Sequence, residues 1–165
     1  MTTQTAFTTE EWNLLRIVPS LVAGGVSAAD PSGIFGSIKE ATAGMRGMIG
    51  SLQQESKGGL LGAMFADKSM PGMPDLKTLV GEGNREQQIA NLKSAVLTRI
   101  KEAANLVSRK ATPEEAQAYK QMIMGVAEKT ANASKEGGFL GFGGVRVSSE
   151  EQSFLNEVKS ALQLT

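Results

Sequence analysis

The chain has 165 residues, with 17 basic and 17 acidic side chains and neither cysteine nor histidine. This length is typical of one domain, and the balanced charge provides no overall field that would attract nucleic acid or an anionic membrane. The missing residue types exclude disulfides, thiolate nucleophiles and zinc sites built on cysteine or histidine, and they remove the commonest proton-transfer group.

The N-terminal stretch MTTQTAFTTEEW lacks the basic start and apolar run of a secretory signal, so we expect a cytoplasmic protein. The longest apolar run, residues 14–29, is shorter than the roughly eighteen uncharged residues of a bilayer span, and it includes Arg16 and Pro19. We expect it to form a buried helix that does not enter a membrane.

The start of the first helix is marked by two local patterns. Thr8 and Glu11 have the spacing of a capping box, in which each side chain bonds the other residue's backbone amide. Phe7 and Trp12 flank that cap at the positions of a hydrophobic staple. We therefore predict a helix over residues 9–29, with a kink at its internal proline.

A second helix is predicted over residues 32–55, because Asp30 can cap it, Pro31 can open it and apolar residues recur at helical spacing. Its opposite side carries small residues, Gly44 and Gly47 among them. Each glycine inside a helix costs about 1 kcal/mol relative to alanine, so we expect another backbone to press close there. That neighbour is the small stretch AGGVSA of the first helix or a second copy of the chain. Alternatively, this face meets solvent and the helix is simply weak.

The connection over residues 58–83 is less regular, with room for short helices at 60–65 and 75–80 on either side of the breaker MPGMP. Flexible thioethers suit an adaptable apolar surface that receives a ligand or a partner helix, and they suit an irregular core equally well. The residues concerned are Met64, Phe65, Met70 and Met73.

Three further helices are predicted over residues 84–110, 113–135 and 149–162, from apolar residues that recur at helical spacing. The last two follow capping boxes formed by Thr112 with Glu115 and by Ser148 with Glu151. Residues 1–165 are thus predicted to form a single all-α domain. Its simplest architecture is an antiparallel bundle of four long helices, with a shorter fifth C-terminal helix packed on it and one or two short helices in the 58–83 connection.

The stretch SKEGGFLGFGGVRVSSEE, residues 134–151, is rich in glycine but fails as a phosphate loop. It lacks the lysine and hydroxyl residue of a Walker motif, and it follows a helix where a dinucleotide fingerprint follows a strand. Phe139, Leu140 and Phe142 are predicted either to fold back and plug the end of the bundle or to contact a partner.

The carboxylates give little support for catalysis or metal binding. A di-iron bundle requires histidines that this chain lacks, and most acidic residues fall in first helical turns, where capping and the helix dipole explain them. The surplus of basic residues over 84–112 is scattered around the helix and has no interleaved aromatics, so nucleic-acid binding is not expected. We expect no enzyme activity, no metal and no cofactor.

The blocks FTTEEW and ADPSGIFGSIKE near the start, and SKEGGFLGFGGVRVSSEE near the end, resemble a group of small uncharacterised bacterial all-helical proteins. The resemblance is loose over residues 58–83. It implies a bacterial, cytosolic helical domain and carries over no activity and no residue role.

Three functional hypotheses follow. The leading one is a non-enzymatic helical protein that acts through protein–protein contacts, as a homo-oligomer or with an unknown protein partner. The second is a binding domain for a small apolar ligand or lipid in a Met- and Phe-lined pocket. The third is a metal-free hydrolase or lyase that uses carboxylates. The candidate contact or ligand surface comprises Phe139, Leu140, Phe142, Met64, Phe65, Met70, Met73, Gly44 and Gly47.

Overall fold

A computed structural model describes residues 1–29, 58–66, 74–133 and 147–164 of the chain. Within these ranges the ordered elements are helices, and no β-strand occurs among them. They are η1 (Gln4–Ala6), α1 (Thr9–Ala29), α3 (Gly59–Ala66), α4 (Leu76–Val80), α5 (Arg85–Lys110), α6 (Pro113–Ala133) and α7 (Ser149–Ala161). The all-α prediction is confirmed, and each helix predicted within the described ranges agrees to within two residues at either end. The helix predicted over 32–55 lies outside them.

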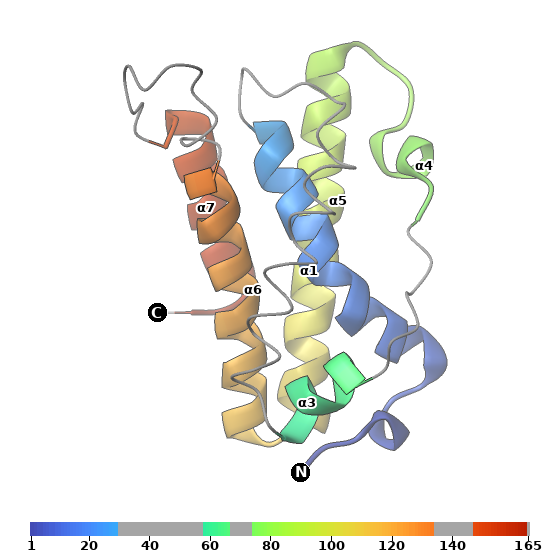
Figure 1. Cartoon of the computed structure of the whole chain (residues 1–165). Coiled ribbons are helices and arrows are strands. Elements are labelled where there is room, and N and C mark those ends of the chain that lie inside the picture. The colour runs from blue at the N-terminus through green and yellow to red at the C-terminus, as the bar shows by residue number, and fades with distance from the viewer. Residues whose placement is uncertain (30–57, 67–73, 134–146, 165) are drawn as a thin grey trace.

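Helices α1, α5, α6 and α7 lie side by side and alternate in direction, which makes the described part an antiparallel bundle (Figure 1). The short α4 packs on α5, and α3 packs on α6 near the start of that helix. Every pair among the four long helices is in contact. An antiparallel bundle is therefore present as predicted, although one of its four predicted long helices, over 32–55, lies outside the described residues. Helix α7, expected as an addition to the bundle, is one of its members.

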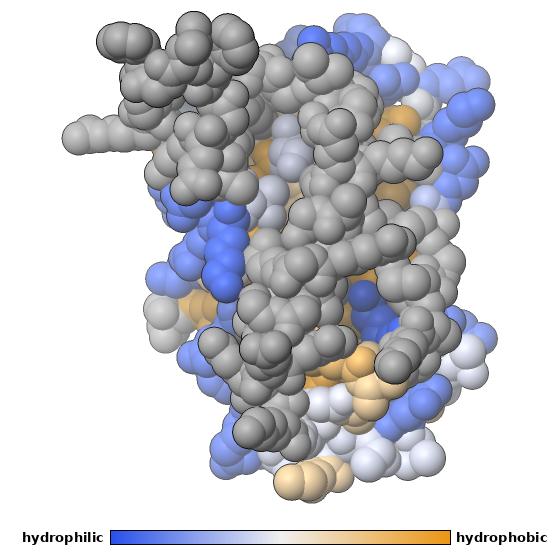
Figure 2. Space-filling model, viewed as in Figure 1, coloured by the Kyte–Doolittle hydropathy of each residue, from blue (hydrophilic) through white to orange (hydrophobic). Residues whose placement is uncertain are grey.

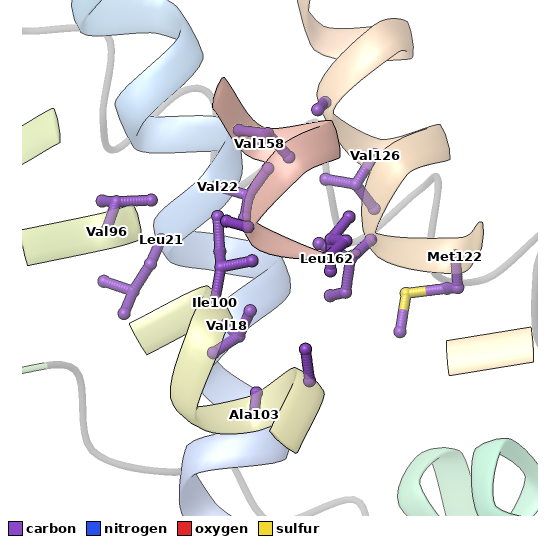
Figure 3. Close-up of a cluster of buried hydrophobic side chains, with 14 of the residues drawn as sticks. Val18, Leu21, Val22, Val96, Ile100, Ala103, Met122, Val126, Val158 and Leu162 are labelled. Carbon is purple, nitrogen blue, oxygen red and sulfur yellow. The ribbon is translucent and has the colours of Figure 1, made fainter. Parts of the chain in front are cut away.

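The core lies where these four helices face one another, and side chains from all four meet there (Figure 3). Most of the positions predicted to face inward on α5, α6 and α7 are buried, with Ile100, Ile123 and Val158 completely so, whereas Ile89 and Thr130 are half-buried. Phe154 on α7 was not expected among them, yet its side chain is also fully buried. The pattern of apolar residues thus identified the faces that pack, and missed the largest side chain that α7 contributes.

The predicted helix starts form as capping boxes. Thr8 with Glu11, Thr112 with Glu115, and Ser148 with Glu151 each show both reciprocal hydrogen bonds. The predicted staple is also present, since the Phe7 and Trp12 rings have centroids 5.7 Å apart. A fourth box, which the sequence interpretation missed, joins Asn84 and Gln87 at the start of α5.

Helix α1 continues through Pro19, which lacks the amide that would bond the Leu15 carbonyl one turn earlier. The Tyr119 hydroxyl, on α6, donates to this carbonyl at 3.0 Å from its oxygen. Tyr119 and Leu15 are fully buried, where an unpaired carbonyl would be costly. A side chain of one helix therefore satisfies the backbone group that proline leaves open in another.

At Gly25, α1 closely approaches its neighbours. A Cβ atom built there would lie 3.0 Å from two atoms of the Phe154 ring and 3.4 Å from Val96 Cγ1. The small stretch of α1 was expected to contact the helix over 32–55, which lies outside the described residues, or a second copy of the chain. At Gly25 this stretch receives an aromatic ring of α7 and a side chain of α5.

Candidate functional site

The predicted contact or ligand residues are divided between described and undescribed parts of the chain. Met64 is buried in the hydrophobic core with 4% of its surface exposed, and Phe65 beside it is half-buried. The remaining candidates lie outside the described residues; they are Met70, Met73, Gly44, Gly47, Phe139, Leu140 and Phe142. The methionines were expected to form either an adaptable contact surface or part of an irregular core. The structure places the Met64 side chain in the core.

The densest polar contact in the described part is at Glu115, in the first turn of α6. Its Oε1 atom accepts hydrogen bonds from the backbone amides of Thr2, at 2.8 Å, and of Leu60, at 3.1 Å. Its Oε2 atom accepts from the Thr2 hydroxyl and from the Thr112 amide, the latter at 3.2 Å. One carboxylate therefore joins the N-terminal segment, α3 and the turn between α5 and α6.

Leu60 is the second residue of α3, so its amide is among the first four of that helix, which have no intrahelical partner. Glu115 completes the box with Thr112 at the start of α6 and at the same time satisfies an open amide at the start of α3. It therefore caps two helices, and negative charge at both N-termini also suits their dipoles.

Gly59 gives this carboxylate room. Its backbone has φ +66°, a left-handed conformation, and a Cβ built on it would lie 2.8 Å from Glu115 Oε1. Any larger residue would have to displace the carboxylate or the backbone of α3. The local geometry thus depends on a glycine at the position immediately before the capped amide.

These contacts change the acidity of the side chain. Partial burial raises the pKa of Glu115, but the hydrogen bonds from Thr2, Thr112 and Leu60 outweigh it and lower the pKa from 4.5 to about 2. The group is therefore a carboxylate throughout the neutral range, and it acts there as an acceptor and not as a proton donor.

Other ionisable groups in altered surroundings also hold helices in place. The Lys110 ammonium, at the end of α5, pairs with Glu11 and lies 5.8 Å from the centroid of the Phe7 ring. The hydrogen bond from Lys110, followed by that from the Thr8 amide, lowers the pKa of Glu11. Lys93 lies 5.1 Å from the centroid of the Phe154 ring. These contacts fasten α5 to the start of α1 and to α7.

The sequence predicted Glu115 only as a cap of its own helix and did not predict its bonds to Thr2 and Leu60. A capping box requires only the pair three residues apart, and Glu115 forms that pair with Thr112. Nothing about Thr2 or Leu60 separates them from other threonines and leucines, and they lie 113 and 55 residues away along the chain. The one local sign of a close contact at this position is the glycine pair before Leu60. Such pairs are too common in loops to indicate a contact with a distant carboxylate.

Among the large apolar side chains of the described part only Met1 is exposed. Figure 2 shows hydrophilic residues along much of the left and right sides of the molecule in this view, with hydrophobic ones visible between them. Within the described ranges, no three acidic side chains come close enough together to hold a metal ion. None of the helices searched in these ranges is both long enough and apolar enough to cross a membrane.

Comparison of the chain with protein-family models, with curated proteins and with solved structures returned no match. The resemblance to small bacterial helical proteins therefore remains a prediction. By its described helices and their contacts, the chain belongs to the class of all-α proteins, with a core that is an antiparallel bundle of α1, α5, α6 and α7.

Proposed function

We propose that this chain is a non-enzymatic, cytoplasmic helical protein that acts through protein–protein contacts, self-association among them. The observation that carries the proposal is how the described helices use their side chains. None of their large apolar groups except Met1 is exposed, and most are buried in one shared core. The carboxylates with altered pKa lie in the first turns of helices and accept hydrogen bonds within the chain. Such a frame is suited to presenting a contact surface, since its apolar side chains and these carboxylates already have partners inside it.

The contact surface in this proposal comes from the two segments whose sequences are unusual. One carries Gly44 and Gly47 on a small-residue face, and the other carries Phe139, Leu140 and Phe142 between glycines. Small faces allow close backbone approach, and aromatic side chains are enriched at the centres of interfaces. The proposal assigns these residues to contact with a second copy of the chain.

Sedimentation velocity over a wide range of protein concentration tests the proposal. We expect the weight-average mass to rise with concentration, and we expect the double variant Phe139→Ser/Phe142→Ser to shift that rise to higher concentration. Glu157→Ser, which changes an exposed residue of α7, is the control and should behave as the parent protein does. A mass that stays at that of one chain, about 17.4 kDa, from micromolar to near-millimolar concentration would refute self-association.

A further inference from the structure

We propose that Glu115 is a latch that holds two segments, residues 2–6 with η1 and the helix α3, against the bundle as one unit. Loss of its hydrogen bonds frees both segments together while α1, α5, α6 and α7 stay folded. This conformational device is independent of the proposed self-association. It rests on hydrogen bonds between residues far apart in the chain and on how few of the other helices these two segments contact in the described part.

The first observation is how the four hydrogen bonds are shared. Each carboxylate oxygen of Glu115 serves Thr2 and one other segment: Oε1 serves the Thr2 and Leu60 amides, and Oε2 serves the Thr2 hydroxyl and the Thr112 amide. Neither oxygen can be lost without weakening the hold on Thr2 and on a second segment at once. The N-terminal segment and α3 are therefore coupled through a single side chain.

The second observation is the packing of the two segments. In the described part, η1 makes its main helix contact with α3, and α3 packs on α6 and η1. η1 itself buries no residue, and the buried Phe7 that follows it packs with Trp12 at the start of α1. α3 is only eight residues long, a length at which an isolated helix is marginal. Each segment thus depends on the other and on the start of α6, whereas the four long helices contact one another directly.

The third observation is what the latch covers. Leu60 is completely buried and Met64 nearly so, and both belong to the hydrophobic core. Both lie on α3, so its release would bring these two side chains to the surface. The bundle would keep the fully buried contacts among its own helices, such as Val18, Ile100, Ile123 and Val158.

Glu115→Gln is the substitution that tests the latch at constant shape. An amide has one acceptor oxygen and places an NH2 group where the other carboxylate oxygen stood, so it faces the donors of Thr2 and of Leu60 or Thr112. Glu114→Gln is the matched control, because Glu114 occupies the same turn, is exposed and makes none of these hydrogen bonds. Gly59→Ala attacks the same contact from α3, where the new Cβ would meet Glu115 Oε1 at 2.8 Å.

The readout is the amide order parameter from ¹⁵N relaxation of the full chain at neutral pH. In the parent protein we expect values near 0.85, those of a rigid backbone, at residues 4–6 and 60–66. In Glu115→Gln we expect both segments to fall below about 0.6 while residues 96–107 of α5 are unchanged, and Glu114→Gln should match the parent. Gly59→Ala should loosen residues 4–6 as well as α3, although the substitution lies far from them in sequence.

Several results would overturn the latch. One is a parent protein in which either segment is already mobile, and another is a Glu115→Gln protein that matches the Glu114→Gln control. Loosening confined to α3 in Gly59→Ala would show that the segments are not coupled. Loosening that spreads into α5 would mean that the contact supports the whole bundle. Gly59→Ala keeps the test decisive if Glu115→Gln does not yield a folded protein.

Discussion

Removing the Tyr119 hydroxyl should destabilise the bundle, because Pro19 leaves the Leu15 carbonyl without any other donor in its helix. In Tyr119→Phe, the buried Leu15 carbonyl loses the donor that now lies 3.0 Å away, while Pro19 still provides no amide in its place. A buried acceptor left without its partner costs about 1–3 kcal/mol of unfolding free energy. Burial also raises the pKa of Tyr119, so in the parent protein the hydroxyl keeps its proton and remains a donor across the usual range of assay.

The role of proline is tested by the double variant. Pro19→Ala restores an amide four residues after Leu15, which can close the missing helical bond without help from Tyr119. The cost of Tyr119→Phe should therefore be smaller in the Pro19→Ala background, by about 1 kcal/mol, a coupling typical of residues that share a partner. Pro19→Ala by itself changes helix propensity and packing together, so its own effect does not enter the test.

Urea unfolding of the parent, the two single variants and the double variant measures this coupling, provided that the m value is the same in all four. Ile123→Val provides the control, because Ile123 is fully buried one turn further along α6 and is not a partner of the Leu15 carbonyl. Its cost, about 0.5–1.5 kcal/mol, should be equal in both backgrounds. An equal cost of Tyr119→Phe with and without Pro19 would refute the assignment of the hydroxyl to the open carbonyl.

The remaining predictions concern two glycines and the pH dependence of stability. Gly125→Ala should stabilise the protein by about 0.5–1 kcal/mol, because a Cβ there meets nothing within 4 Å and α6 gains a better helix former; chemical denaturation checks this. Gly25→Ala should destabilise it by about 1–3 kcal/mol in the same assay, because its Cβ would lie 3.0 Å from the buried Phe154 ring, and an unchanged midpoint would contradict the tight contact. The pKa of Glu115 is lower in the folded chain, so its contribution is complete above the ordinary value of 4.5 and is lost as the pH falls towards about 2. The unfolding free energy lost in Glu115→Gln should therefore be constant above about pH 6 and shrink below pH 4.5. The fall in pKa alone corresponds to a loss of at most about 3 kcal/mol. Because this group is partly exposed and solvent screens it, we expect a loss of about 1–2 kcal/mol. A difference that persists unchanged down to about pH 2 would show that ionisation of Glu115 is not its source.

Local patterns in the sequence predicted the helices and most of their starts. A capping box depends on two residues three apart, and a staple on two residues five apart, so both can be read without knowing the fold. Thr8 with Glu11 and Phe7 with Trp12 formed as expected for this reason. The box of Asn84 and Gln87 was missed because only Ser or Thr paired with Glu had been sought.

Contacts between distant segments could be predicted only in part. From Pro19 the sequence predicted only a kink in α1. The donor that bonds the open Leu15 carbonyl lies 104 residues further along the chain, and the sequence has no local sign of it. The small residues of α1 predicted a close approach, but a small residue accepts a ring, a side chain or a backbone equally well. The occupant of the space at Gly25 is Phe154, which lies beside the predicted inward residue Leu155 on α7.

Three hydrogen bonds between helices share a feature that hydrophobic packing cannot supply. Tyr119 bonds the Leu15 carbonyl left open by proline, Glu115 bonds an open amide at the start of α3, and Asn91 bonds the Val80 carbonyl at the end of α4. In each case the side chain of one helix reaches a backbone group that the other helix cannot satisfy itself.

Apolar ridges repeat along a helix, so packing alone leaves a neighbour nearly as well placed one turn, about 5.4 Å, higher or lower. An open backbone group occurs at one height only, and a buried one is costly when unpaired. Tyr119 therefore sets the height of α6 along α1, Glu115 that of α3 along α6, and Asn91 that of α4 along α5. The polar side chains of this frame contribute register, while the apolar ones contribute most of the stability.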